Sequence, residues 1–148
     1  VEKVSSHLAD ALDKGARVVA SGTGREGDRF VRPVLVTGAN PDMRLASEET
    51  FGPLAPVFRF DSEEEGLRLA NDTQYGLASY FYTRDISRAF RVAEGLEAGM
   101  IALNTGSIAM EMAPFGGIKQ SGLGREGGLE GIDEYLETKA FHIGAIGA

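Results

Sequence analysis

The chain has 148 residues, of which 43% are hydrophobic and 25% are charged, and its formal net charge is −7. This composition is ordinary for a globular protein, and the length suffices for one domain with a substantial core. Its basic residues are scattered singly, which leaves no cationic patch for nucleic acid, and its longest apolar runs are too short to cross a membrane.

The first half of the chain reads as helices alternating with strands. We predict a helix over 1–14, strands over 16–20, 30–36 and 55–60, and a helix over 63–71. The first helix shows apolar residues on one face, and Gly15 fits its C-terminal end. Pro33 indicates that the second strand is an edge strand or contains a bulge. Ser62 is placed to cap the second helix, whose first turn is acidic.

The second half continues this alternation. We predict a turn at Tyr75-Gly76, strands over 77–82, 100–103 and 138–143, and helices over 86–96 and 132–136. Asp85 is placed to cap the helix that follows it. Residues 107–128 are rich in glycine and lack periodicity, which is typical of a long functional loop. Strands that alternate with helices predict a layered α/β domain with a mostly parallel sheet.

Two phosphate-binding motifs are matched only superficially. Residues 122–127 read G-x-G-x-x-G, but the residues before them do not form a strand, so the match lacks the context of a dinucleotide-binding unit. Lys119 is followed by Gln120 and not by Ser or Thr, so a Walker-type loop fails as well. A glycine-rich loop that crosses close to other backbone explains both matches better.

A succession of short motifs carries more information than any of them alone. They are Glu49-Thr50-Phe51-Gly52-Pro53, Asn71-Asp72-Thr73-Gln74-Tyr75-Gly76-Leu77, Asn104-Thr105-Gly106, Pro114-Phe115-Gly116-Gly117-Ile118-Lys119-Gln120-Ser121-Gly122 and Ile132-Asp133-Glu134-Tyr135-Leu136. In order and spacing, over almost the entire chain, they resemble the aldehyde dehydrogenases, and most closely the succinate-semialdehyde dehydrogenase branch. The resemblance implies that residues 1–137 are the C-terminal part of the catalytic α/β domain and that 138–148 hold an oligomerisation strand and the C-terminus.

The resemblance also implies where the chemistry lies. In the family, a cysteine thiolate attacks the aldehyde and a glutamate activates water, and both lie upstream of the segment matched here. This chain contains no cysteine, so we expect no catalytic residue on it and no activity from it alone. The full-length enzyme would use NAD or NADP to oxidise succinate semialdehyde or a similar semialdehyde. The alternative is a truncated, non-catalytic homologue that acts as a binding or assembly module.

Three residues match the family's cofactor-binding positions. Glu49 corresponds to the carboxylate that accepts both hydroxyls of the nicotinamide ribose, and two carboxylate oxygens suit a vicinal diol. Phe51 corresponds to the ring behind the nicotinamide, and Leu77 to a residue at the same end of the cofactor. Without the resemblance, these would read as an exposed acid, a core aromatic and a buried strand leucine.

Residues 104–115 correspond to the loop that lines the aldehyde tunnel, where Phe115 matches an aromatic near the reacting carbon. Ala109 replaces a serine with which the succinate-semialdehyde branch usually reaches the substrate carboxylate, and Ser107 could supply the missing hydroxyl. His7 and His142 lack ligand-spaced partners, so we expect no metal site. We also expect a cytoplasmic homo-oligomer, a dimer or a dimer of dimers, with no nucleic-acid or membrane partner.

Overall fold

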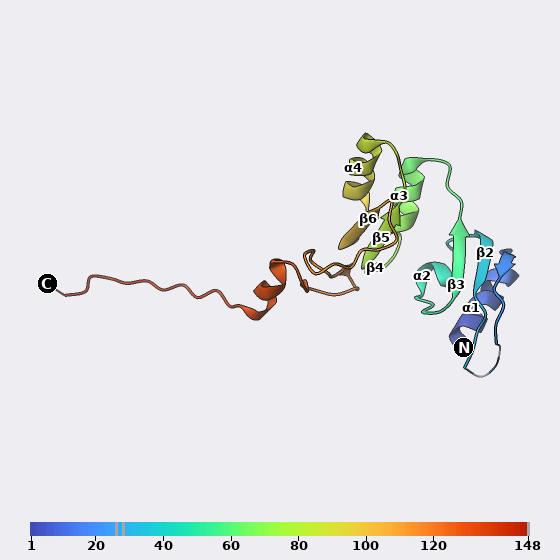
Figure 1. Cartoon of the computed structure of the whole chain (residues 1–148), viewed down its shortest axis with the longest axis horizontal. Coiled ribbons are helices and arrows are strands. Elements are labelled where there is room, and N and C mark those ends of the chain that lie inside the picture. Colours follow the sequence, from blue (N-terminus) through green and yellow to red (C-terminus); the bar gives the residue numbers. More distant parts are fainter. Residues whose placement is uncertain (26, 28, 148) are drawn as a thin grey trace. The chain divides into compact units, whose positions relative to one another are not determined.

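The computed structural model describes residues 1–25, 27 and 29–147, and the chain divides into two compact units, Val1–Thr73 and Gln74–Ala148. Both units combine helices with small sheets (Figure 1). This confirms the α/β class that the alternating pattern predicts. Within the described residues, no helix is long and apolar enough to span a bilayer.

The first unit is built on a three-stranded sheet in the order β1-β2-β3. Strand β1 (Arg17–Ser21) is antiparallel to β2 (Val34–Ala39), which is parallel to β3 (Leu54–Phe58). The helices of this unit are α1 (Glu2–Asp13), α2 (Arg44–Ser47) and α3 (Glu63–Asn71). Its core consists of Val4, Ala11, Ala16, Val36, Met43, Leu45 and Leu54.

Local signals located the helix ends well. Helix α1 lies within the predicted range, and Gly15 follows it with a φ of +97°, a conformation that glycine adopts without penalty. The hydroxyl of Ser62 accepts a hydrogen bond from the backbone N–H of Glu65 at 3.1 Å, which confirms the predicted cap of α3. The predicted caps therefore depend on interactions within one turn of chain.

Two features of the first unit differ from what the sequence predicts. The strand predicted over 30–36 begins only after Pro33. Of the two alternatives that Pro33 indicated, the edge strand is wrong, because β2 is the middle strand of its sheet, whereas the register of β2 with β3 does shift at a bulge or irregularity between Thr37 and Ala39. Proline has no N–H to donate, so it stands just outside the ladder, where its carbonyl accepts from Gly22 N at 2.8 Å. The four-residue helix α2 was missed, because tertiary contacts support it: the backbone N–H of Arg44 donates to Asp10 on α1 at 2.8 Å.

The second unit contains two two-stranded sheets. Strand β4 (Tyr75–Gly76) is antiparallel to β7 (Ile118–Lys119), and β5 (Ala78–Phe81) is parallel to β6 (Met100–Leu103). Helix α4 (Ile86–Gly95) connects β5 to β6, and the 3-10 helix η1 spans Glu130–Tyr135. Asp85 caps α4 as predicted, by accepting from Arg88 N at 3.1 Å.

Several features of this unit differ from the predictions. Tyr75-Gly76 is a strand and not a turn, because it pairs with residues far along the chain. The prediction of mostly parallel pairing holds for half of the strand pairs in the two units: β2–β3 and β5–β6 are parallel, whereas β1–β2 and β4–β7 are antiparallel. Residues 136–147 form no helix or strand, so the strand predicted over 138–143 is not formed within the described chain. A strand forms only where another strand is beside it to accept and donate hydrogen bonds. The predicted role of residues 138–143 in oligomerisation stays a prediction.

Candidate functional site

A turn between α2 and β3 presents Glu49 and Phe51 to solvent. The Phe51 side chain is 88% exposed, and its backbone has a φ of +49°, which is uncommon for a residue with a side chain. Within the described residues, the exposed carboxylate of Glu49 has no hydrogen-bond or ion-pair partner. Within this chain Phe51 is thus not a core aromatic, and both side chains are accessible to a ligand.

The turn is attached to α1 through His7, which is fully buried. Its Nδ1 lies 2.9 Å from the Thr50 hydroxyl, and its Nε2 lies 3.1 Å from Oε2 of Glu48. The sequence shows no acidic partner at ligand spacing from His7, and the fold supplies one from a distant part of the sequence, Glu48. Val4, His7 and Ala11 are spaced along the buried face of α1, and that spacing is the signal that could have revealed a buried histidine.

Glu48 is itself fixed by α2. The guanidinium of Arg44 donates from Nε to Oε1 at 2.8 Å and from Nη2 to Oε2 at 2.9 Å, the two-pronged geometry that arginine forms with carboxylates. These bonds from Arg44, and then the bond from His7, lower the pKa of Glu48 to about 2. Glu48 is therefore an ionised anchor of the turn and is not available as a base.

Packing and backbone bonds complete the support of the turn. A Cβ added to Gly52 would overlap the Cγ2 atom of Val4 on α1, so only glycine allows this close approach. Beyond the turn, the carbonyl of Pro53 accepts from Val34 N at 2.8 Å, where β3 joins the sheet. The turn is thus fixed at both ends, by α1 and by the sheet.

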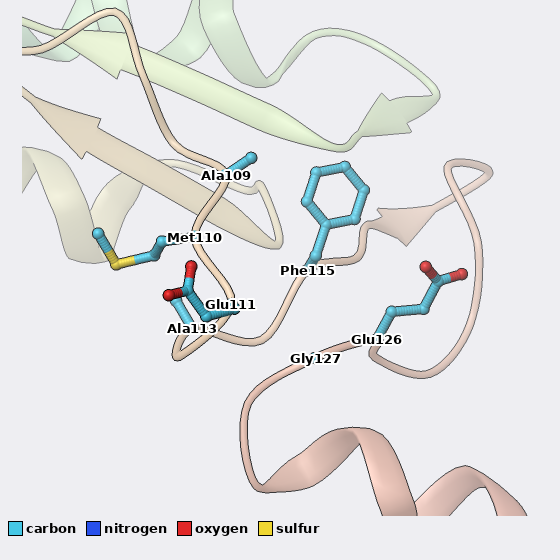
Figure 2. Close-up of a pocket in the computed structure, with 7 residues that line it drawn as sticks. All are labelled: Ala109, Met110, Glu111, Ala113, Phe115, Glu126 and Gly127. Carbon is cyan, nitrogen blue, oxygen red and sulfur yellow. The ribbon is translucent and has the colours of Figure 1, made fainter.

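In the second unit, the loop after β6 forms an open hollow of about 400 Å³. Its lining residues are Ala109, Met110, Glu111, Ala113, Phe115, Glu126 and Gly127. Figure 2 shows the Phe115 ring between Ala109 and Glu126, with the Met110 side chain directed away from the ring. Two predicted pocket residues, Ala109 and Phe115, therefore lie together. Ser107 is not among the lining residues, and its backbone N–H donates to Thr105 Oγ1 at 3.1 Å.

Backbone pairing holds the two sides of this hollow together. Phe115 and Glu126 exchange two N–H···O=C bonds of 2.7 Å, and Gly128 N donates to the carbonyl of Glu111 at 3.1 Å. At the start of the loop, Asn104 has a φ of +57°, and its side chain bonds to both the N–H and the carbonyl of Thr83, at 2.9 and 2.8 Å. Sequence reasoning missed Glu111 as a lining residue, because the bonds that place it connect distant segments.

Leu77 lies between β4 and β5 in the second unit, whereas Glu49 and Phe51 belong to the first. Its side chain is 42% exposed, so it is not the buried strand leucine of the alternative interpretation. Its carbonyl accepts from Met100 N at 3.0 Å, which fixes its backbone to the start of β6.

The glycine-rich segment 122–127 has a structural role. Arg125 donates from Nη1 to the carbonyls of Gly117 and Gly124, at 3.0 and 2.7 Å, and so ties the segment to the residues before β7. The prediction that no strand precedes the segment is wrong, because β7 (Ile118–Lys119) does. However, β7 is two residues long and antiparallel to β4, and the next element is the 3-10 helix η1, so this is not the strand–turn–helix arrangement of a dinucleotide-binding unit. Among the described residues, no group of three or more His, Cys, Asp or Glu side chains could hold a metal ion.

Comparison with known proteins gives a consistent result. The model of the aldehyde dehydrogenase family matches residues 1–141. The 3-sulfolactaldehyde dehydrogenase of Pseudomonas putida is 56% identical over 99% of this chain and 30% of its own length. The NADP(+) succinate-semialdehyde dehydrogenase of Escherichia coli is 55% identical over 97% of this chain and 30% of its own length.

A solved structure agrees with these relatives. The succinate-semialdehyde dehydrogenase of Burkholderia pseudomallei superposes with a TM-score of 0.86 and 61% identity, over 90% of this chain and 28% of that one. The chain thus spans about 30% of the length of the curated relatives that it matches. It belongs to the aldehyde dehydrogenase family.

Proposed function

We propose that this chain is the C-terminal part of a longer NAD(P)-dependent aldehyde dehydrogenase. The complete enzyme converts an aldehyde, an oxidised nicotinamide cofactor and water into a carboxylate and the reduced cofactor. The family match and the share of each relative that the chain covers support this proposal. The observation that carries it is the solvent-facing turn at Glu49 and Phe51.

The side chains of this turn fit a nicotinamide riboside. Glu49 offers two carboxylate oxygens that no described residue uses, which suits the two hydroxyls of a ribose. Phe51 offers an exposed ring against which a planar, apolar group can pack. A bound nicotinamide cofactor would supply the acceptor for the substrate's hydride. The task of Glu49 and Phe51 is to fix its orientation.

The proposed binding site for the substrate is the hollow beside Phe115. The relatives named above act on small aldehydes that carry an acidic group, and we propose a semialdehyde such as succinate semialdehyde for this enzyme. The lining residues include two glutamates and no cation. The hollow itself therefore offers no cation for the substrate's distal carboxylate.

Glu49→Gln in the complete enzyme tests the cofactor role. The amide keeps the shape of the side chain but loses the charge-assisted bonds to the ribose, so the nicotinamide is held less precisely. Misplacing a reacting centre by about 1 Å can cost ~100-fold in rate. We expect hydride transfer, followed by single-turnover absorbance of the reduced cofactor, to slow more than cofactor binding weakens.

The isolated chain provides the complementary test. It contains no cysteine to act as nucleophile, and we expect no turnover of any aldehyde. Turnover by the purified chain would refute the proposed division of the active site. A complete reading frame without an upstream cysteine would instead favour a non-catalytic assembly module.

A further inference from the structure

We propose that His7 is a positioning residue that holds Glu49 and Phe51 in their cofactor-facing conformation by binding Glu48 and Thr50 on either side of Glu49. This inference rests on the proposed function, because it assigns a role to a residue that acts through the cofactor-binding turn. His7 itself is buried and touches neither substrate nor cofactor in this role.

The burial of His7 requires an explanation. An apolar residue would suit this position of α1, between Val4 and Ala11 on the buried face, and burying a polar group costs free energy unless it is hydrogen-bonded. Both ring nitrogens have partners, at 2.9 and 3.1 Å, and both partners belong to the same short turn. Both side-chain hydrogen bonds of the histidine therefore connect α1 to this turn.

The direction of the bonds follows from the partners. The Glu48 carboxylate can only accept, so Nε2 of His7 donates its proton to Oε2. In the neutral ring, Nδ1 then accepts from the hydroxyl of Thr50. Because Arg44 binds both oxygens of Glu48, that carboxylate has a fixed orientation and transmits it to the ring. One histidine thus determines the placement of the residues before and after Glu49.

The backbone of the turn needs such support. Phe51 has a φ of +49°, a left-handed conformation that costs free energy in a residue with a Cβ and persists only where surrounding contacts impose it. The Phe51 ring is almost free of contacts and cannot supply them. Its neighbours do: Thr50 is bound by His7, and Gly52 packs against Val4 one turn earlier on α1.

Variants of His7 in the complete enzyme test the inference. His7→Leu removes both bonds at similar volume, His7→Asn retains a polar group near the Nδ1 position, and His7→Gln retains one near Nε2. Leu8→Ala is the matched control, because Leu8 packs against the same core from the same helix but does not bond to the turn. Should His7→Leu fail to fold, Thr50→Val removes the hydroxyl from the other side with little change of shape.

Two measurements separate positioning from simple stability. The first is hydrogen–deuterium exchange of the backbone amides of residues 49–52 in the absence of cofactor. The second is the rate of hydride transfer in a single turnover, which is compared with the affinity for the cofactor. For His7→Leu we expect faster exchange in the turn and hydride transfer slower by about tenfold or more. His7→Asn and His7→Gln should recover part of both effects. Leu8→Ala should lower the melting temperature with neither effect.

A double-mutant cycle with Glu49→Gln tests whether His7 affects hydride transfer through Glu49. If His7 acts through Glu49, Glu49→Gln slows hydride transfer less in the His7→Leu background than in the wild type. Equal exchange and equal hydride-transfer rates in His7→Leu and Leu8→Ala would overturn the inference and leave the proposed function intact. A normal hydride-transfer rate in Glu49→Gln alone would overturn the cofactor role of the turn, and the inference with it.

Discussion

Gly99→Ala should distort the loop that carries Phe115. Gly99 immediately precedes β6, and a Cβ added there would overlap the carbonyl oxygen of Gly116 and lie 2.9 Å from the Cα of Gly117. Carbon atoms in ordinary contact are about 3.5–4.0 Å apart, so the contact with Gly117 alone requires the backbone at 116–117 to move by at least about 0.6 Å, and the overlap with the Gly116 carbonyl oxygen requires more. These are backbone atoms, which cannot evade the methyl group by changing a rotamer.

The cost of this shift follows from its size. Overpacking of this kind typically destabilises by about 1–3 kcal/mol, and we expect a loss in that range in urea unfolding of the complete enzyme. A displacement of about 1 Å next to Phe115 could also lower kcat/KM by up to ~100-fold. Both losses should occur together, since one backbone movement causes them.

Gly106→Ala is the control for this prediction. A Cβ there meets no atom within 4 Å, and Gly106 is not among the glycines with a positive φ. The same substitution at this position should be neutral, or stabilising by about 0.4–1 kcal/mol through the lower entropy of the unfolded chain. Equal effects of the two substitutions on the free energy of unfolding would refute the reasoning about close backbone approach.

Three further predictions concern separate features of the chain. The pKa of Glu48 is lowered from 4.5 to about 2, so the bonds of its carboxylate stabilise the fold above pH 4.5, and this stabilisation is lost as the pH falls toward 2. In Glu48→Gln, the urea concentration at the midpoint of unfolding should therefore depend less on pH between 4.5 and 2. Ala109→Ser should raise kcat/KM for succinate semialdehyde relative to butanal by about one to two factors of ten, as for a well-placed hydrogen bond to a charged group, and a flat ratio would argue against the tunnel role of this loop. Deletion of the residues after Glu137 should reduce the complete enzyme to monomers or aggregates in light scattering, and an intact oligomer would contradict the predicted oligomerisation strand.

Features that depend on neighbours in sequence could be predicted. The caps at Ser62 and Asp85 need only the next turn of helix, and both formed as expected. The strand over 100–103 was placed correctly as well, because its apolar run ends in distinct boundary residues. The collinear motifs led to the family, which the comparisons confirm.

Features that depend on distant partners could not be predicted. Tyr75-Gly76 reads as a turn, and only pairing with β7 makes it a strand. His7 reads as isolated, because Glu48 and Thr50 approach it only once α1 packs beside the turn. Of the predicted site residues, Ala109 and Phe115 line one hollow, and Glu49 and Phe51 lie exposed on one turn. The roles of all the predicted site residues stay predictions.

The pairing of β4 with β7 has a consequence for the order of folding. Strands β5 and β6 are joined through α4, and this local unit lies entirely within the loop that the β4–β7 pair closes. Closing a longer loop costs more chain entropy, and two strands of two residues each form few hydrogen bonds to offset that cost. The β5-α4-β6 unit should therefore form first and the β4–β7 pair last. By the same argument, the β4–β7 pair should be the first part of the second unit to open, while the helix and strands between β4 and β7 stay folded.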